Sequence, residues 1–279
     1  MIERYLNALG EKTKPWNSLR KTGLLFEIIK NSWTINSAAA RYDLNPLEIK
    51  SWCDAAFHSI EKTLQIKPPR EHSYVDMVFD VGANSGQYAK KIRKEGYDKT
   101  IISFEPIAAA HSALQLNSKD DPRWIIHPRC ALADFKGEAW INVAENSYSS
   151  SLLNILEAHT RAAPDSKYIS RERIKIEPLD SIYNKYYKHD MRVMLKIDTQ
   201  GFEDKVLIGG KRSLDSIGIV RLELSTVPLY EGQRLYDYFF HFFEKKGFGL
   251  WDVQPAFQDR RTGRLLQFDA VFVRDGFLE

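Results

Sequence analysis

From Met77 onwards, short runs of apolar residues alternate with amphipathic segments of helical period. The apolar runs predict strands, and they lie at 77–81, 100–105, 124–132, 192–198 and 219–225. The segments of helical period lie between most of these runs, at 86–94, 107–117, 202–207 and 235–246. Strands that alternate with helices in this way predict an α/β fold with a parallel sheet and right-handed crossovers.

The end of the chain follows a different pattern. The segments "FGLWDVQ" and "FDAVFV" are separated by the turn-rich stretch "DRRTGR". Two strands joined in this way predict an antiparallel hairpin at the edge of the sheet. An irregular insertion is expected at about 133–180, with an extra hairpin in "DFKGEAWINV" and a serine-rich loop in "ENSYSSSLLNIL".

The residues before 67 show helical patterns only, and Pro68 and Pro69 mark a linker because proline continues a helix poorly. We therefore expect a helical accessory domain at 1–66 and the α/β domain at 67–279. The segment "TINSAAARYDLNPLEIKSWCDAAFHSI" in the accessory domain resembles a helix-turn-helix. Asn45 is expected to cap the second helix, with Pro46 at its first position and Glu48 completing a capping box. The apolar contacts between the two helices are expected from Ala39, Leu44, Leu47 and Trp52.

A helix-turn-helix that reads DNA needs hydrogen-bond donors on the early exposed positions of its second helix. Those positions carry Glu48, Lys50, Ser51 and Asp54, a mixed set that suits phosphates and bases poorly. Nucleic-acid binding is therefore not favoured. Formation of a homodimer or capture of a substrate is the favoured role of these helices.

Composition narrows the setting of the protein. The chain has 279 residues and a net charge of +3, which is ordinary for a globular protein. Two cysteines, Cys53 and Cys130, supply neither a disulfide framework nor a metal cluster, so we expect a reducing, cytoplasmic environment. We expect no membrane span and no signal peptide, because no apolar run approaches the required length of about 18 residues.

Acidic residues end four of the predicted strands: Asp80, Glu105, Asp198 and Glu223. The carboxyl ends of parallel strands meet at one edge of a sheet, where ligands of such folds bind. These acids are therefore expected around a common binding site. The alternative is that they are solvent-facing strand ends without a ligand.

The glycine-rich turn after Asp80 distinguishes two nucleotide ligands. A dinucleotide site requires the spacing G-x-G-x-x-G, whereas this turn reads Gly82-x-Asn84-x-Gly86. Asp80 suits a ligand that carries an ammonium group, and Glu105 can accept hydrogen bonds from ribose hydroxyls. A ligand with an amino acid, a ribose and no phosphate fits better, and S-adenosylmethionine is such a ligand.

Six ordered segments resemble the FkbM-type S-adenosylmethionine-dependent methyltransferases, over about residues 75–275. They are "FDVGANSGQYA", "SFEP", "CALAD", "SSSLL", "PLDSI" and "LKIDTQGFEDKVLIGG". The resemblance implies a class I methyltransferase fold, with a Rossmann-like sheet of seven strands. It also implies methyl transfer to a hydroxyl of a sugar or secondary metabolite. The chain departs from the family at Thr199 and Gln200, where an apolar residue and a glutamate are more usual, so a charge-dependent role at position 200 is not expected.

The resemblance also implies a set of cofactor-binding residues. The methionine part of the cofactor is assigned to Asp80 and the turn Gly82, Ala83, Asn84 and Gly86, with Tyr88 packing behind it. The ribose and adenine are assigned to Glu105, Pro106, Ala131 and Asp134. Ser149 and Ser150 belong to a loop that is expected to fold over the cofactor, and Asp198 is assigned to the cofactor site as well.

The segment "LKIDTQGFEDKVLIGG" is expected to carry the chemistry. Lys196 and Asp198 share one face of a strand by its two-residue period, and Asp198 ends that strand. We expect Asp198 to act as general base and Lys196 to hold a substrate oxygen or tune Asp198. Glu203 and Glu223 are expected to orient these groups. Two alternatives remain, namely an internal ion pair without catalytic role and a divalent ion held by the carboxylates.

The sequence therefore predicts an S-adenosylmethionine-dependent O-methyltransferase that acts on a hydroxyl of a sugar, glycan or secondary metabolite. A DNA-associated regulator with a cofactor-binding domain is one alternative. An N-methyltransferase is the other, although Asp198-Thr199-Gln200-Gly201 stands where such enzymes carry the motif N/D-P-P-Y/F.

Overall fold

The computed structural model describes residues 15–30, 32–64 and 70–278. The chain forms two compact units, Met1–Pro68 and Pro69–Glu279, and each is described here by itself. The boundary expected between residues 66 and 67 lies outside the described residues. Within the described part of the chain, no helix combines the length and the apolar character needed to cross a membrane.

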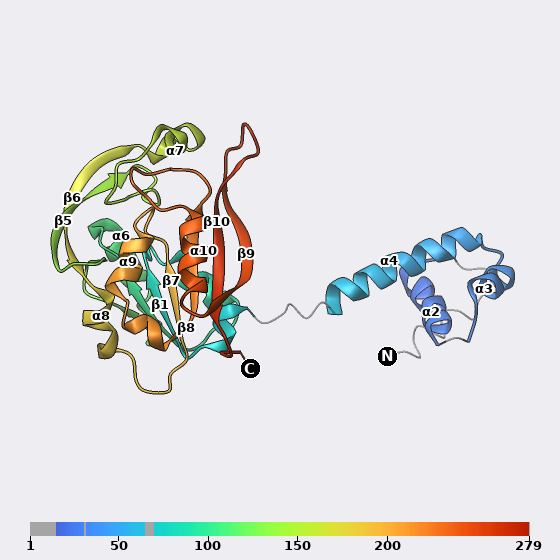
Figure 1. Ribbon diagram of the computed structural model, residues 1–279. Coiled ribbons are helices and arrows are strands. Elements are labelled where there is room, and N and C mark those ends of the chain that lie inside the picture. The colour runs from blue at the N-terminus through green and yellow to red at the C-terminus, as the bar shows by residue number, and fades with distance from the viewer. Residues whose placement is uncertain (1–14, 31, 65–69, 279) are drawn as a thin grey trace. The chain divides into compact units, whose positions relative to one another are not determined.

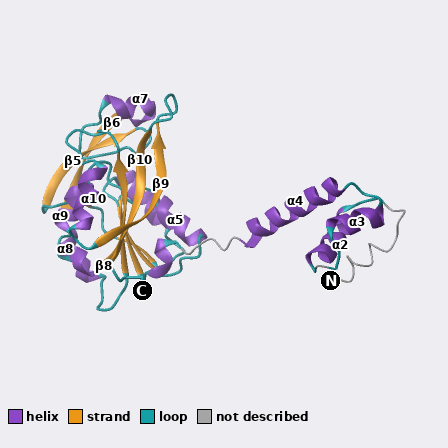
Figure 2. Ribbon diagram, turned by 45° about the vertical axis from the view of Figure 1, so that its right-hand side comes forward, coloured by secondary structure: helices purple, strands orange, loops and turns teal. Residues whose placement is uncertain are grey.

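The larger unit is built on a seven-stranded sheet with the order β3-β2-β1-β7-β8-β10-β9. Figure 2 shows the strands in orange. The strands of this sheet are β1 Met77–Val81, β2 Thr100–Phe104, β3 Trp124–Ile126, β7 Val193–Ile197, β8 Ile217–Ser225, β9 Phe248–Gln258 and β10 Leu265–Arg274. In this sheet β3, β2, β1, β7 and β8 run parallel to one another, whereas β10 runs antiparallel to both β8 and β9. The predicted parallel sheet and its terminal antiparallel hairpin are both confirmed. Taken in chain order within this sheet, the strands follow the arrangement of class I methyltransferases.

Helices cover both faces of this sheet (Figure 1). They are α5 Gln87–Lys94, α6 Ala108–Asn117, α8 Leu179–Ile182, α9 Glu203–Gly209 and α10 Tyr236–Glu244. Alternate residues of a strand point to opposite faces, so Phe79 packs in one core with α8, α9 and α10. Its neighbour Val78 packs in the other core with α5 and α6. The short helix η1 Glu71–Tyr74 precedes β1.

The insertion forms a second sheet with the order β4-β6-β5, from β4 Ala131–Leu132, β5 Gly137–Ala144 and β6 Tyr168–Glu177. This corrects two predictions. The run 124–132 is not one strand, because β3 ends at Ile126 and β4 belongs to the second sheet; Pro128, which has no N–H to donate, lies in the break. The segment "DFKGEAWINV" is not a hairpin, because its single strand β5 pairs with β6 instead. The helix α7 Glu157–Ala162 lies between β5 and β6.

The smaller unit contains α2 Ser18–Ile29, α3 Ile35–Tyr42 and α4 Pro46–Leu64. The predicted cap is confirmed, since the Asn45 Oδ1 accepts a hydrogen bond from the Leu47 N–H at 2.9 Å. Ala39, Leu44 and Trp52 contribute to the core as expected. Leu47 does not, and its side chain is 73% exposed. The face of α4 that packs is set by Ile49 and Cys53, four residues apart, and Leu47 lies off that face.

The early positions of α4 that a DNA reader would use, Glu48, Lys50, Ser51 and Asp54, are all exposed. Since these positions are accessible, their exposure does not argue against nucleic-acid binding. The prediction of weak binding rests on the mixed chemistry of their side chains.

Gly209, the last residue of α9, packs closely against Ala133, which follows β4 of the second sheet. A substitution of Gly209 tests this packing. A Cβ added to Gly209 would lie 1.9 Å from the Ala133 carbonyl oxygen. Alanine usually stabilises a helix relative to glycine, but here we expect Gly209→Ala to lower the free energy of unfolding by about 1–3 kcal/mol through overpacking. Gly249→Ala is the control, because no atom lies within 4 Å of the added Cβ. Equal urea-unfolding midpoints for the two variants would contradict this packing.

Candidate functional site

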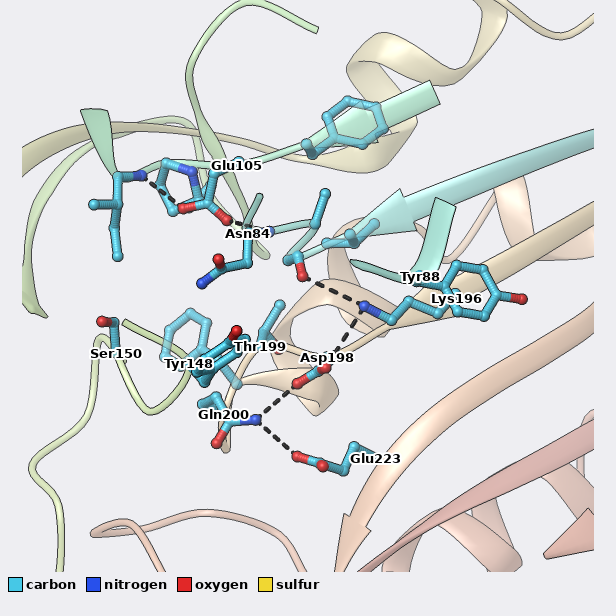
Figure 3. Close-up of a pocket in the computed structure, with 18 of the residues that line it drawn as sticks. Asn84, Tyr88, Glu105, Tyr148, Ser150, Lys196, Asp198, Thr199, Gln200 and Glu223 are labelled. Atoms are coloured by element: carbon cyan, nitrogen blue, oxygen red, sulfur yellow. Dashed lines mark hydrogen bonds and ion pairs between the residues drawn. The ribbon is translucent and has the colours of Figure 1, made fainter. Parts of the chain in front are cut away.

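A pocket of about 380 Å³ opens where the carboxyl ends of β1, β2, β7 and β8 meet (Figure 3). Of the predicted site residues, those that line it are Gly82, Ala83, Asn84, Tyr88, Glu105, Pro106, Ala131, Ser150, Lys196, Asp198 and Glu223. Those that do not are Asp80, Gly86, Asp134, Ser149 and Glu203. The four strand-end acids therefore gather at one place, although Asp80 lies behind the pocket wall.

The turn after β1 brings the backbone close to the end of β7. Gly82 has a φ of +74°, and a Cβ there would lie 1.9 Å from the carbonyl oxygen of Asp198. Only glycine satisfies both constraints. Gly86, with a φ of +88°, makes room for the Trp124 ring instead, since its Cβ would lie 2.4 Å from that ring. Gly86 thus shapes the turn without facing the pocket.

Glu105 lies between the polar turn and an apolar slot. Its side chain is held at both oxygens: Oε2 accepts from the Asn84 N–H and Oε1 from the Ile107 N–H, each at 2.8 Å. A carboxylate offers about four acceptor positions, so the group retains capacity for a ligand. Burial raises the pKa of Glu105 to about 7 against the effect of these hydrogen bonds.

The slot beyond Glu105 is lined mainly by apolar side chains: Pro106, Ile107, Ala131, Leu132, Ile141 and Phe202. A planar base fits such a wall, and the adjacent carboxylate fits the ribose. Asp134 lies outside the slot, where it is exposed and its Oδ2 lies 3.5 Å from the Lys205 Nζ. The adenine contact predicted for Asp134 therefore stays without structural support.

Lys196 lies at the centre of the polar half of the pocket. Its Nζ lies 3.2 Å from the Asp80 Oδ1 and 3.6 Å from the Asp198 Oδ2, and it donates to the Gly82 carbonyl at 3.3 Å. Burial alone would lower the pKa of Lys196, but the charges of Asp80 and Asp198 outweigh it and raise this pKa above its usual value. Asp80 is fully buried and meets Lys196, so a direct contact with a ligand ammonium is not available to it.

Asp198 and Glu223 are linked by a side chain that the sequence did not single out as a site residue. The Gln200 Nε2 donates at 2.7 Å to the Asp198 Oδ1 and at 2.7 Å to the Glu223 Oε2, and Figure 3 shows its amide between them. Burial, and after it the charges of Asp198 and Asp269, raise the pKa of Glu223 well above its usual value. The Asp198 side chain remains 35% exposed. It is thus available to a ligand while both of its oxygens have protein neighbours.

Glu203 holds the turn that carries Gln200. Its Oε1 accepts from the N–H groups of Thr199 and Gly201, at 3.0 and 3.1 Å. Burial raises the pKa of Glu203 to about 7 despite these bonds. The Glu203 carboxylate therefore holds the backbone of the turn on both sides of Gln200.

The serine-rich loop contributes to one wall of the pocket. Ser147, Tyr148, Ser150 and Leu152 line it, and the Asn84 Nδ2 donates to the Ser147 Oγ at 3.2 Å. Ser149 points away from the pocket, where its Oγ lies 3.3 Å from the His159 Nε2. Tyr148 was missed although it lies beside the predicted serines.

Other lining residues were missed as well: Gln87, Lys91, Thr199, Gln200, Arg221 and Asp269. Arg221 had a usable signal, since it shares a strand face with Glu223 by the two-residue period. Among the residues that line the pocket there is no histidine. His127 donates to or accepts from the Tyr186 hydroxyl at 2.7 Å outside it.

A protein-family comparison connects this site to known proteins. The model of the methyltransferase FkbM domain matches residues 80–250, which contain the glycine turn, Glu105 and the whole Lys196–Glu203 segment. The chain belongs to this family. It is an S-adenosylmethionine-dependent methyltransferase, and the cofactor agrees with the buried carboxylate, the apolar slot and the close glycine turn. No curated protein sequence matches the chain.

Solved structures with similar folds have low sequence identity to it. Fibrillarin from Aeropyrum pernix with bound S-adenosyl-L-methionine is 12% identical, covers 78% of this chain and 74% of its own, and gives a TM-score of 0.42. A putative tRNA (m1A22) methyltransferase from Streptococcus pneumoniae is 10% identical, with 72% and 66% covered and a TM-score of 0.40. An uncharacterized protein from Listeria monocytogenes serotype 4b is 8% identical, with 74% and 65% covered and a TM-score of 0.41. The chain thus spans just under two thirds of the Listeria protein.

The raised pKa of Glu105 generates a prediction for cofactor binding. Ribose hydroxyls donate to the ionised carboxylate, so binding favours the form without a proton. With a pKa of about 7, the affinity for S-adenosylhomocysteine should rise by about tenfold from pH 6 to pH 8 and level off above. Calorimetry across this range measures it. Glu105→Gln should bind more weakly and lose the rise; a variant that keeps the wild-type pH dependence would contradict the assignment.

Proposed function

We propose that the enzyme transfers the methyl group to a hydroxyl of a sugar, glycan or secondary metabolite. The observation that carries this proposal is the position of Asp198. Its carboxylate is half-buried at the end of β7, beside the glycine turn, and lies against both Lys196 and Gln200. A carboxylate in that place can take the proton that a hydroxyl must lose.

S-adenosylmethionine supplies a methyl group on a positively charged sulfur, which leaves with the bonding electron pair. The chain has to orient the acceptor oxygen in line with that methyl group and remove its proton. In our proposal Glu105 and the slot beside it hold the nucleoside, and the turn at Gly82–Asn84 holds the methionine part. Asp198 accepts the hydroxyl proton as the oxygen forms its bond to the methyl carbon.

The polar lining of the pocket supports a polar acceptor. Besides Asp198, it includes Gln87, Lys91, Arg221, Glu223 and Asp269. Arg221 is buried and pairs with Glu71 at 2.5 Å and Asp269 at 2.7 Å, so this wall is fixed before the acceptor binds. Side chains of both signs can donate to and accept from a compound with several hydroxyls.

The cellular setting belongs to the same proposal. Cys53 and Cys130 are unpaired, buried thiols, and burial raises the pKa of Cys130 to about 12. Such thiols are unreactive and suit a reducing cytoplasm. The smaller helical unit is proposed to serve dimerisation or acceptor capture.

Replacing Asp198 tests the proposed chemistry. Asp198→Asn should lower kcat by about 10²–10⁴, the usual contribution of a general base, while the affinity for S-adenosylhomocysteine changes little. The assay is methyl transfer to an acceptor identified by a mass-spectrometric screen of sugars and hydroxylated metabolites. Asp215→Asn is the control, because Asp215 is exposed on η4 (Ser213–Ser216), outside the pocket.

Two outcomes would contradict this assignment. Near-full turnover by Asp198→Asn would place the base elsewhere. A large loss of wild-type activity in EDTA would instead make Asp198 a metal ligand.

A further inference from the structure

The Gln200 side chain lies between two acidic side chains, an arrangement that the sequence did not predict. One amide nitrogen donates to two carboxylates, Asp198 and Glu223, at 2.7 Å each. Burial and the charge of Asp198 raise the pKa of Glu223, and the hydrogen bond from Gln200 acts against this shift because it favours the ionised carboxylate. Among described residues, Glu223 has one more side-chain donor, the Gln267 Nε2 at 2.8 Å, and Gln267 makes no such contact to Asp198.

The orientation of the Gln200 amide is fixed by its other end. Its Oε1 accepts a hydrogen bond from the Tyr230 hydroxyl at 2.8 Å, and Tyr230 is fully buried. The Tyr230 hydroxyl has one proton and also lies 3.2 Å from the Ser149 carbonyl oxygen, so the shorter contact directs that proton to Oε1. The reversed amide would set Oε1 against the Asp198 carboxylate, which is repulsive.

The backbone at Gln200 is held in a conformation that glutamine disfavours. Its φ is +56°, in the left-handed region where residues other than glycine are uncommon. The turn is kept there by Glu203, which accepts from the N–H groups on either side, and by the Ser151 hydroxyl, which donates to the Gln200 carbonyl at 2.7 Å. Strain of this kind, maintained by several hydrogen bonds, is typical of functional positions.

We propose that Gln200 is a positioning residue for methyl transfer, whose amide takes the place of a cation between Asp198 and Glu223 and fixes the Asp198 carboxylate toward the acceptor. The catalytic half of the proposal is the positioning of Asp198 for methyl transfer, and it rests on the proposed function above. The structural half is the replacement of a cation by an amide, and it does not depend on that function.

The catalytic half is tested by Gln200→Met, which has a similar length and no donor. Loss of a hydrogen bond to a charged group should lower kcat by about 10- to 100-fold. It should also move the acid limb of the kcat profile to higher pH, because the ionised Asp198 carboxylate loses a donor. The KM for S-adenosylmethionine should stay unchanged. Gln267→Met is the matched control, because it removes a donor from Glu223 alone, so the acid limb should stay in place. A Gln200→Met profile that overlays the wild type would overturn the positioning role.

The structural half is tested without any acceptor by Gln200→Glu. Three carboxylates would then converge, and such a set binds hard divalent cations through oxygen. The Tm of Gln200→Glu should rise with millimolar Mg²⁺ or Ca²⁺, whereas the Tm of the wild type and of Gln200→Met should not. S-adenosylhomocysteine binding by calorimetry shows that each variant keeps a folded site. A Tm of Gln200→Glu that ignores both cations would overturn the replacement, whatever the acceptor proves to be.

Discussion

The site depends on the ion pairs that the buried Lys196 ammonium group forms with Asp80 and Asp198. This group joins two segments that are more than 100 positions apart in sequence: Asp80 and the carbonyl of Gly82 at the end of β1, and Asp198 at the end of β7. A buried charge is tolerated only when it is paired and hydrogen-bonded. Lys196 therefore holds the turn after β1 close to the Asp198 carboxylate, the two groups that we propose for the cofactor and the acceptor. The 1.9 Å approach of a Gly82 Cβ to Asp198 is the steric consequence of that same closeness.

The ion pair continues as a polar row across one face of the sheet. Strand register places Asp80 beside Lys196 and Lys196 beside Arg221, and each cation is paired with an acid: Lys196 with Asp80 and Arg221 with Asp269. Arg221 extends the row through Asp269 to Gln254 in β9. The same face becomes apolar two residues earlier along each strand, where Val78 and Met194 pack under α5. The change from apolar to polar within one residue pair separates the core under α5 from the pocket, which Lys196 and Arg221 line.

Local sequence patterns predicted the strands that carry the site well, but they predicted the contacts between residues distant in sequence poorly. The apolar run at 77–81 became β1 without change, and the two-residue period placed Lys196 next to Asp198 correctly. The position of Asp80 could not be predicted in the same way, because only the register between β1 and β7 shows that Lys196 covers it. Likewise, the glycine pattern does not show that Gly86 accommodates Trp124, 38 positions later in the sequence. The partner of β5 was missed for the same reason, since pairing with β6 is a non-local choice.

Gln200 departs from the family pattern, which usually has a glutamate at this position, and its neighbours in the structure give the amide a role. From the sequence, a charge-dependent role is not expected at position 200, where an amide stands in place of an acid. The sequence could not indicate that the amide supplies what a carboxylate lacks, namely N–H groups that can face two carboxylates together. Glu203, Ser151 and Tyr230 each contact a different part of this residue: the flanking N–H groups, its carbonyl and its side-chain oxygen. The turn is therefore organised around the direction of one amide, and the chain sustains a left-handed backbone at Gln200 to keep that direction.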